Sequence, residues 1–373
     1  MKEISIYIHI PFCLQKCSYC NFYSIAYDTQ IVEKYMRGLI KEIGKFKGND
    51  YIVKSVYFGG GTPSLLSFFQ LFPIISKIAH TFHIDKNAEI TLEANPSTIN
   101  RIKAQDWKTL GINRISIGAQ SFHDNELKLL GRIHSAEEIE QAVECVAEYC
   151  TLNYSLDLMY GIPGQTCDSW RKSILRAIEL HPMHISSYCL SVEKNTPLYN
   201  IKDQLPFPDE DSQRDMYYSM ISFLESHNIQ QYEISNFALR GYESQHNTSY
   251  WMGKEYVGFG ASAHSYYNMT RYANISDVNR YIHSIQNELP IVKSKKEIPT
   301  REYISDLIFL GLRMRRGISL SSIKTRYGFD LEKEYKHTIE TYSKLGYLTI
   351  VDDHLKLTRK ALFVSDEILR EFV

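Results

Sequence analysis

The sequence predicts an α/β protein whose core is a partial barrel of six strand–helix units, followed by a small, mainly helical domain. Six short runs rich in β-branched and aromatic residues alternate with amphipathic segments in the first half of the chain. Apolar residues recur in those segments at spacings of three and four, which is typical of helices. Such alternation predicts right-handed crossovers and a parallel sheet. Six units are too few to close an eight-stranded barrel, so an open doubly wound sheet is the structural alternative.

Chemically distinctive residues fall where the expected strands end. The strands are expected at residues 4–10, 54–60, 88–95, 113–120, 153–161 and 184–191, and the clearest helical patterns at residues 32–46, 67–82 and 136–150. Three cysteines follow the first strand, three glycines end the second, and acidic or amide side chains end the next three. Ligands bind parallel sheets of this kind at the carboxyl ends of the strands. We therefore expect one functional site at that end.

Three segments are expected along the chain. Residues 1–205 form the α/β core, which ends in a stretch with three prolines and little apolar periodicity. Residues 206–296 form an extension with additional strands, in which Asp209 is expected to cap a helix over residues 212–227. Residues 297–373 contain three or four helical patterns and a short hairpin at 347–357, so that this segment resembles a winged helix.

Composition and charge limit the classes of partner. The 373 residues are 44% hydrophobic and carry a formal net charge of -1, so no basic surplus favours nucleic acid. The winged-helix-like segment is therefore interpreted as a lid or docking domain. No signal-peptide pattern and no uninterrupted apolar run of about 18 residues is found. We expect a cytoplasmic protein without a membrane span, for which peripheral membrane contact stays open. The odd number of cysteines, seven, does not favour a disulfide framework.

Three of the cysteines lie on one short loop. Cys13, Cys17 and Cys20 are separated by three and then two residues. Structural zinc sites are usually closed tetrahedra with four ligands, and a three-thiolate zinc site or incidental thiols are the alternatives. A four-iron four-sulfur (4Fe–4S) cluster can instead be held at three corners by three cysteines, which leaves one iron open. The spacing therefore favours a 4Fe–4S cluster whose open iron binds a small molecule.

This loop, CLQKCSYC, resembles the cluster loop of the radical S-adenosylmethionine superfamily, including the aromatic Tyr19 before the last cysteine. The resemblance implies that the amino and carboxylate groups of S-adenosylmethionine bind the open iron. It also implies that electron transfer to the sulfonium produces a 5'-deoxyadenosyl radical. S-adenosylmethionine is therefore the expected second cofactor.

Other residues at the strand ends suit a nucleotide. The glycine run at residues 59–61 lets the backbone approach a ligand, although an ordinary turn is the alternative. Glu93 and Asp157 can accept hydrogen bonds from an ammonium or a ribose, or can cap the next helix. Gln120 suits a ribose or carboxylate contact. Arg132 can neutralise a carboxylate, with a surface salt bridge as the alternative.

Seven motifs in one order resemble the family of oxygen-independent coproporphyrinogen oxidases and their relatives over nearly the whole chain. They read YIHIPFC, GGGTPS, LEANP, GAQSF, LGRIHS, DLMYGIPGQT and HNTSYW. The resemblance implies that Cys13, Cys17 and Cys20 ligate the cluster. It implies a nucleotide site lined by Tyr7, Tyr19, Gly60, Gly61, Thr62, Glu93, Gln120, Arg132 and Asp157.

One departure separates this chain from the oxidases. The oxidases carry a longer amino-terminal arm and a fourth cysteine two positions after the third, whereas this chain has Phe22 there. The chain therefore resembles the heme chaperone branch of the family, the HemW proteins. That resemblance implies a protein that binds heme and delivers it to an acceptor such as a respiratory protein. A radical oxidoreductase acting on a porphyrinogen is the alternative.

The HNTSYW motif is the typical feature of that branch and contains the expected heme ligand, His246. Imidazole is a good axial ligand for heme iron, and Tyr250 and Trp251 can stack on a porphyrin. A buried, hydrogen-bonded histidine with two core aromatics is the alternative. His264, which follows a run of small residues, is a secondary candidate. The acceptor, the use of radical chemistry and the formation of a homodimer stay open.

Overall fold

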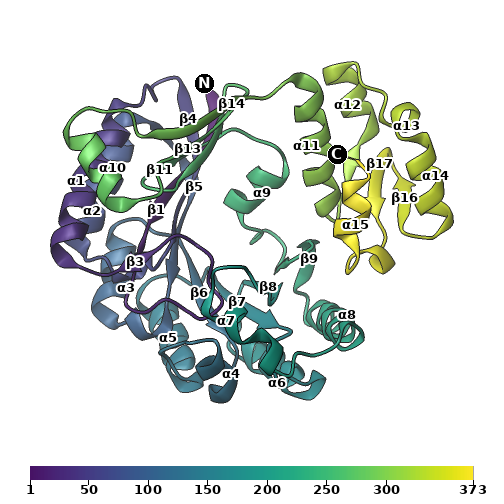
Figure 1. Cartoon of the computed structure of the whole chain (residues 1–373), viewed down its shortest axis with the longest axis horizontal. Helices are drawn as coiled ribbons and strands as arrows, with labels where there is room; N and C mark the ends of the chain where they lie inside the picture. Colours follow the sequence, from purple (N-terminus) through teal and green to yellow (C-terminus); the bar gives the residue numbers. More distant parts are fainter. Residues whose placement is uncertain (373) are drawn as a thin grey trace.

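The computed structural model describes residues 1–372 and contains the expected partial barrel (Figure 1). All six predicted strands are present, parallel and adjacent in chain order within one sheet. A doubly wound sheet would reverse its strand order at a switch point, so this alternative is wrong. The six strands are β1 (Lys2–Ile10), β4 (Tyr51–Gly60), β5 (His83–Ala94), β6 (Arg114–Gln120), β7 (Tyr154–Tyr160) and β8 (His184–Cys189).

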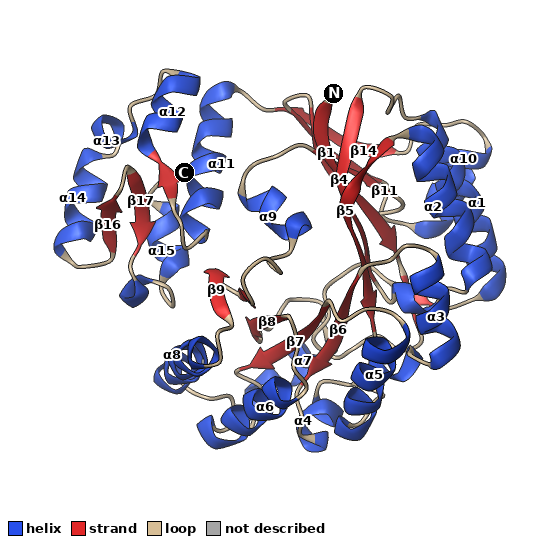
Figure 2. Ribbon diagram, turned by 180° about the vertical axis from the view of Figure 1, so that it is seen from behind, coloured by secondary structure: helices blue, strands red, loops and turns tan. Residues whose placement is uncertain are grey.

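Helices cover the outer, convex face of this sheet (Figure 2). Most of them begin at polar caps: Ser135 and Glu138, for example, form a reciprocal capping box at the start of α5, the second helix after β6. The three helical patterns of the sequence are confirmed. The helices of this part are α1 (Thr29–Lys45), α2 (Phe68–Thr81), α3 (Arg101–Thr109), α4 (Asp124–Leu129), α5 (Ala136–Tyr149), α6 (Cys167–Glu179) and α7 (Pro197–Ile201), with short 3-10 turns η1 (Pro63–Leu65), η2 (Pro96–Thr98) and η3 (Lys202–Gln204).

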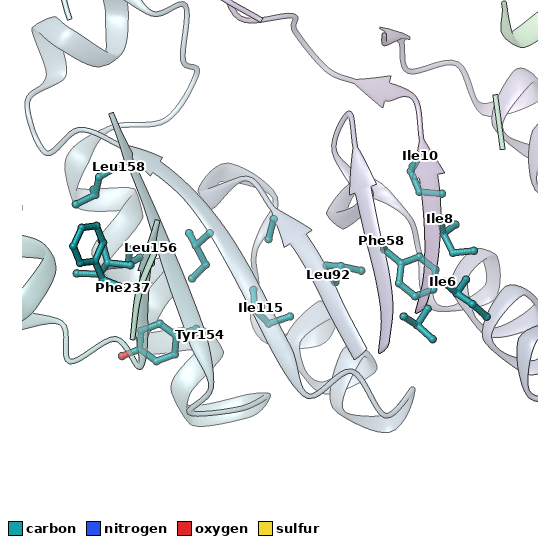
Figure 3. Close-up of a cluster of buried hydrophobic side chains, with 14 of the residues drawn as sticks. Ile6, Ile8, Ile10, Phe58, Leu92, Ile115, Tyr154, Leu156, Leu158 and Phe237 are labelled. Carbon is teal, nitrogen blue, oxygen red and sulfur yellow. The ribbon is translucent and has the colours of Figure 1, made fainter. Parts of the chain in front are cut away.

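The core lies between the sheet and these helices (Figure 3). In β1 the isoleucines at positions 4, 6, 8 and 10 point to the helices and are buried, while Ser5, Tyr7 and His9 point to the inner face. This period of two follows from strand geometry. The same phase puts polar side chains such as Glu93, Arg114 and Asp157 inside the barrel, so the inner face is equipped for binding.

Further strands extend both edges of the sheet. β11 (Tyr256–Phe259) is parallel to β1, and β10 (Asn236–Ala238) is antiparallel to β8. Asp209 accepts a hydrogen bond of 2.8 Å from the Ser212 amide, which confirms the expected cap. The remaining elements of this region are α8 (Glu210–Ser226), β9 (Gln230–Glu233), α9 (Gln245–Trp251), β12 (His264–Tyr267), β13 (Thr270–Asn274), α10 (Val278–Gln286) and β14 (Val292–Glu297).

A separate C-terminal domain lies on the open side of the curved sheet (Figures 1 and 2). The expected hairpin is present, with Asp352 and Asp353 at its tip at φ 51° and 66°. No helix among residues 1–372 is long and apolar enough to cross a membrane. The domain contains α11 (Thr300–Arg313), β15 (Ile318–Ser319), α12 (Leu320–Tyr327), α13 (Leu331–Glu334), α14 (Lys336–Lys344), β16 (Leu348–Val351), β17 (His354–Leu357), η4 (Arg359–Ala361) and α15 (Ser365–Arg370).

Candidate functional site

A cavity of about 430 Å³, here called the cysteine cavity, opens between the cysteine loop and the inner face of the sheet. Its walls come from the loop after β1 and from strands β4 to β8, and they include the strand ends where the sequence predicts the site. The structure therefore brings most of the expected residues together. Those that line this cavity are Cys13, Cys17, Tyr19, Cys20, Gly60, Gly61, Thr62, Glu93, Gln120, Arg132 and Asp157.

The cysteine loop is closed and anchored by main-chain contacts. Two short parallel strands, β2 (Phe12–Cys13) and β3 (Ile25–Ala26), pair at its base. On its far side the Ser18 amide donates to the Leu130 carbonyl at 3.0 Å, and the Leu198 amide donates to the Ser18 carbonyl at 2.8 Å. These contacts tie the loop to α4 and α7, so the three thiols are presented from a fixed frame.

The donor set fits a multi-iron cluster better than a single ion. All three thiols are free and partly exposed to the cavity. Within residues 1–372 no three His, Cys, Asp or Glu side chains lie close enough together to hold one metal ion. A 4Fe–4S cluster takes each thiolate on a different iron, which spaces the sulfurs more widely than the ligands of one ion. The three thiols border one cavity, as the ligands of a cluster held at three corners must.

Arg132 brings positive charge to these thiols. Its Nη1 lies 3.5 Å from the Cys17 Sγ, and its Nη2 donates to the Gly118 carbonyl at 2.6 Å. Its buried Nε has no hydrogen-bond partner among the described residues. A partly buried guanidinium beside a thiolate offsets its negative charge, and the unused Nε donor can serve a carboxylate. Arg132 therefore forms no surface salt bridge with any residue from 1 to 372, and its contact with a carboxylate stays a prediction.

The glycine run packs directly on the start of the cysteine loop. The Gly61 amide donates to the Ile10 carbonyl and the Thr62 amide to the Phe12 carbonyl, each at 2.8 Å. A Cβ at Gly61 would lie 2.7 Å from the Phe12 carbonyl oxygen, which is closer than Cβ atoms approach other heavy atoms in real structures. Gly60 has a φ of 112°, a conformation that favours glycine. The glycines therefore support Cys13 as well as lining the cavity.

Three polar side chains face the cavity from the strands. The Glu93 carboxylate accepts from the Tyr57 hydroxyl at 2.9 Å and the Gly60 amide at 3.1 Å, and burial raises its pKa to about 7. The Asp157 carboxylate accepts from the Ser116 hydroxyl at 3.0 Å, and burial raises its pKa too. Gln120 ends β6 at a φ of 68°, a strained conformation that is frequent at functional sites.

Two expected residues do not line the cysteine cavity. Tyr7 borders a second cavity of about 690 Å³, here called the tyrosine cavity. His246 is 1% exposed and lies between the two cavities, with its ring 4.9 Å from the ring of Tyr57. Its Nδ1 is 2.9 Å from the Ser55 hydroxyl and its Nε2 is 2.8 Å from the Tyr250 hydroxyl. Burial lowers its pKa to about 3, which keeps the ring neutral. Both ring nitrogens are therefore engaged in this conformation.

The residues of the HNTSYW motif lie in different surroundings. Asn247 lines the cysteine cavity and Tyr250 lines the tyrosine cavity. The Trp251 ring packs under the guanidinium of Arg313 at 4.7 Å, against the C-terminal domain. The motif therefore contacts both cavities and α11, which its sequence does not reveal.

Arg114 is a cavity residue that the sequence analysis missed. It lines the cysteine cavity, is 1% exposed, and its Nε has no hydrogen-bond partner in the described part of the chain. The signal was present in the period of two, because Arg114 shares the inward phase of Ser116, Gly118 and Gln120 on β6. The carboxylates of Glu89 and Asp157 offset the charge of this buried cation, and its unpartnered Nε can donate to a polar ligand in the cavity.

Comparisons with known proteins identify the family. Residues 7–177 match the model of the radical SAM superfamily, and residues 298–364 match that of the HemN C-terminal domain. The chain is 36% identical over 376 residues to the heme chaperone HemW of Bacillus subtilis, covering 99% of each chain. The chain belongs to the HemW family. HemW of Lactococcus lactis is 31% identical over 100% of this chain and 98% of its own.

A solved relative establishes the fold of this HemW family member independently. Coproporphyrinogen III oxidase (HemN) from Escherichia coli superposes with a TM-score of 0.87 over 100% of this chain and 90% of that one, at 20% identity. The radical SAM core with a separate C-terminal domain, predicted from the sequence, is thereby confirmed.

Proposed function

We propose that this HemW family member is a cytoplasmic heme chaperone that holds a 4Fe–4S cluster with S-adenosylmethionine, binds heme, and passes it to an acceptor such as a respiratory protein. The observation that carries the proposal is the tyrosine cavity, a second space of about 690 Å³ beside the cysteine cavity. Its volume lies within the usual range for cofactor sites. Full-length similarity to proteins named heme chaperones supports the same function.

We assign the cysteine cavity to the cluster and the nucleotide. Cys13, Cys17 and Cys20 would hold the cluster, which supplies single electrons to the sulfonium of the nucleotide when both are bound. Arg132 would receive the methionine carboxylate, and Glu93 would accept hydrogen bonds from the ammonium. The other residues assigned to the nucleotide are Tyr19, Gly60, Gly61, Thr62, Gln120 and Asp157, whereas Tyr7, expected among them from the sequence, borders the tyrosine cavity.

The position of Phe22 favours a chaperone over an oxidase. Phe22 is 65% exposed and lines both cavities, at the place where the oxidases carry a fourth thiol. A benzyl side chain there has neither the thiol nor the exchangeable proton that a cysteine would provide. The chain therefore lacks the reactive side chain that an oxidase would carry between the cluster loop and the tyrosine cavity.

The test uses full-length protein with a reconstituted cluster under anaerobic conditions. We expect one equivalent of hemin to co-elute with the protein in gel filtration, and we expect coproporphyrinogen to remain unoxidised in the presence of S-adenosylmethionine and a reductant. The same elution gives the oligomeric state. Steady oxidation of coproporphyrinogen without hemin retention would show that the protein is an oxidase and would overturn the proposal.

A further inference from the structure

The tyrosine cavity is built from segments near the start, in the middle and near the end of the chain. Tyr7 and His9 come from β1, Asn21 to Tyr23 follow the cysteine loop, and Tyr303 comes from α11 of the C-terminal domain. The remaining wall is formed by α9, β11, β12 and β13. The cavity therefore joins the cluster loop to the C-terminal domain.

Its lining suits a flat aromatic macrocycle. Tyrosine rings offer broad apolar faces together with a hydroxyl that can meet a polar edge. The six tyrosines that line it are Tyr7, Tyr23, Tyr250, Tyr256, Tyr266 and Tyr303. We propose that heme binds in the tyrosine cavity and that His264 supplies its axial nitrogen, an inference that rests on the proposed function.

Comparison of three histidines leads to His264. The His9 ring is 3.0 Å from the Tyr7 hydroxyl through Nδ1 and 3.2 Å from the Tyr23 carbonyl through Nε2, so both of its nitrogens are engaged. The nitrogens of His246 are engaged by Ser55 and Tyr250. His264 is exposed, lines the tyrosine cavity, and makes no side-chain hydrogen bond to any residue from 1 to 372. It is the histidine of the three whose lone pair is available to iron.

The backbone that carries His264 is held rigidly. The Gly260 amide donates to the buried Glu42 carboxylate at 2.8 Å, and the Asn274 amide donates to the Ala263 carbonyl at 2.9 Å. A Cβ at Gly260 would lie 2.3 Å from the Tyr35 hydroxyl, so a larger residue does not fit there. A ligand supplied from a fixed backbone loses little freedom when it binds a metal, which favours this position for an axial ligand.

His246 then acts as a positioning residue. Its Nε2 meets the Tyr250 hydroxyl at 2.8 Å, and Tyr250 forms part of the tyrosine cavity. The sequence predicts His246 itself as the ligand; iron coordination by its ring would require loss of one of its two hydrogen bonds and exposure of a buried side chain. In this proposal His246 lies in the wall between the tyrosine cavity and the cysteine cavity, because Tyr250 lines the first and Asn247 the second.

Charged side chains at this cavity can meet the heme propionates. Lys254 and Arg271 line it, and both are about half exposed, at 42% and 47% of their side chains. Each already has a partner: Lys254 pairs with Glu3 at 2.9 Å, and Arg271 pairs with Asp306 at 2.7 Å. Asp306 also lines the cavity, so a propionate would share Arg271 with this carboxylate.

The experiment titrates full-length, cluster-reconstituted protein with hemin and records the Soret absorbance and the electron paramagnetic resonance spectrum. The variants are His264→Ala, His246→Ala and, as a matched control away from both cavities, His283→Ala on α10. We expect His264→Ala alone to lose the spectral signature of an axial nitrogen and to bind hemin about 10-fold or more weakly. Free imidazole should restore the signature in this variant, because it can occupy the vacated position.

The results test heme binding and the role of His264 separately. If the unmodified protein binds no stoichiometric hemin, the proposed function fails. If it binds hemin and His264→Ala keeps the axial-nitrogen signature, the proposed function stands and the assignment of His264 is overturned. Loss of the signature in His246→Ala with retention in His264→Ala would also overturn it. A weaker affinity of His246→Ala with an unchanged signature supports a positioning role for His246.

Discussion

Substitution of Gly61 by alanine should disturb the frame that presents the cluster cysteines. The added Cβ would lie 2.7 Å from the Phe12 carbonyl oxygen and 2.8 Å from the Ile10 carbonyl oxygen. Both atoms belong to the backbone, so neither can swing away as a flexible side chain would. The β1–β2 junction and the glycine run must therefore separate.

The expected cost can be worked out from these contacts. Forcing an extra methyl group into a packed site costs about 1–3 kcal/mol. The separation also weakens the hydrogen bonds from Gly61 to Ile10 and from Thr62 to Phe12, each worth about 0.5–1.5 kcal/mol. We therefore expect Gly61→Ala to lower the free energy of unfolding by about 2–6 kcal/mol.

Urea unfolding of the cluster-free protein, followed by circular dichroism, measures this loss. Gly44→Ala is the control, because Gly44 lies exposed in α1 and a Cβ there would meet only the Lys77 side chain, at 3.6 Å. Alanine at a helical glycine should raise the free energy of unfolding by about 0.5–1 kcal/mol. If Gly61→Ala unfolds at the same urea concentration as Gly44→Ala, the packing of the glycine run on the cysteine loop is not as the structure describes.

Two further predictions concern the cysteine cavity. Serine at Cys13, Cys17 or Cys20 should abolish retention of iron and sulfide after reconstitution, whereas Cys167→Ser, at an exposed thiol outside the loop, should retain both; equal iron contents would refute the cluster assignment. Burial raises the pKa of Glu93 from 4.5 to about 7, so its contribution to stability is full below pH 4.5 and is lost as the pH rises through 7. The free energy of unfolding of Glu93→Gln, measured with urea, should therefore rise relative to that of the unmodified, cluster-free protein by about 2–3 kcal/mol as the pH increases from 5 to 8. If the difference between the two proteins does not change with pH, the Glu93 carboxyl is not buried as the structure describes.

Local patterns were sufficient for the elements of the core. The alternation of Ile4, Ile6 and Ile8 with Ser5 and Tyr7 defines a strand with one apolar face, because side chains alternate along any strand. The three cysteines lie within eight residues, so they share one loop whatever the rest of the fold is. The strands, the Asp209 cap and the 347–357 hairpin were predictable for this reason.

Contacts between distant segments were not predictable. Tyr7 and Tyr57 lie on adjacent strands with stacked rings 6.2 Å apart, yet Tyr7 borders the tyrosine cavity and Tyr57 the cysteine cavity. The motif around His246 packs between the two, and its partner Ser55 is 191 positions away in the sequence. A residue pattern shows which face of an element is polar. It does not show which cavity that face meets, because this depends on non-local packing.

A heme chaperone hands heme to another protein, and the rate of that transfer can be measured. Protein loaded with one equivalent of heme is mixed anaerobically with increasing concentrations of a heme-free b-type cytochrome, and the acceptor's Soret band is followed, with and without S-adenosylmethionine. Direct handover requires a complex of the two proteins, so we expect a transfer rate that rises with acceptor concentration. A rate independent of acceptor concentration would mean that heme is simply released into solution, and would contradict the chaperone function.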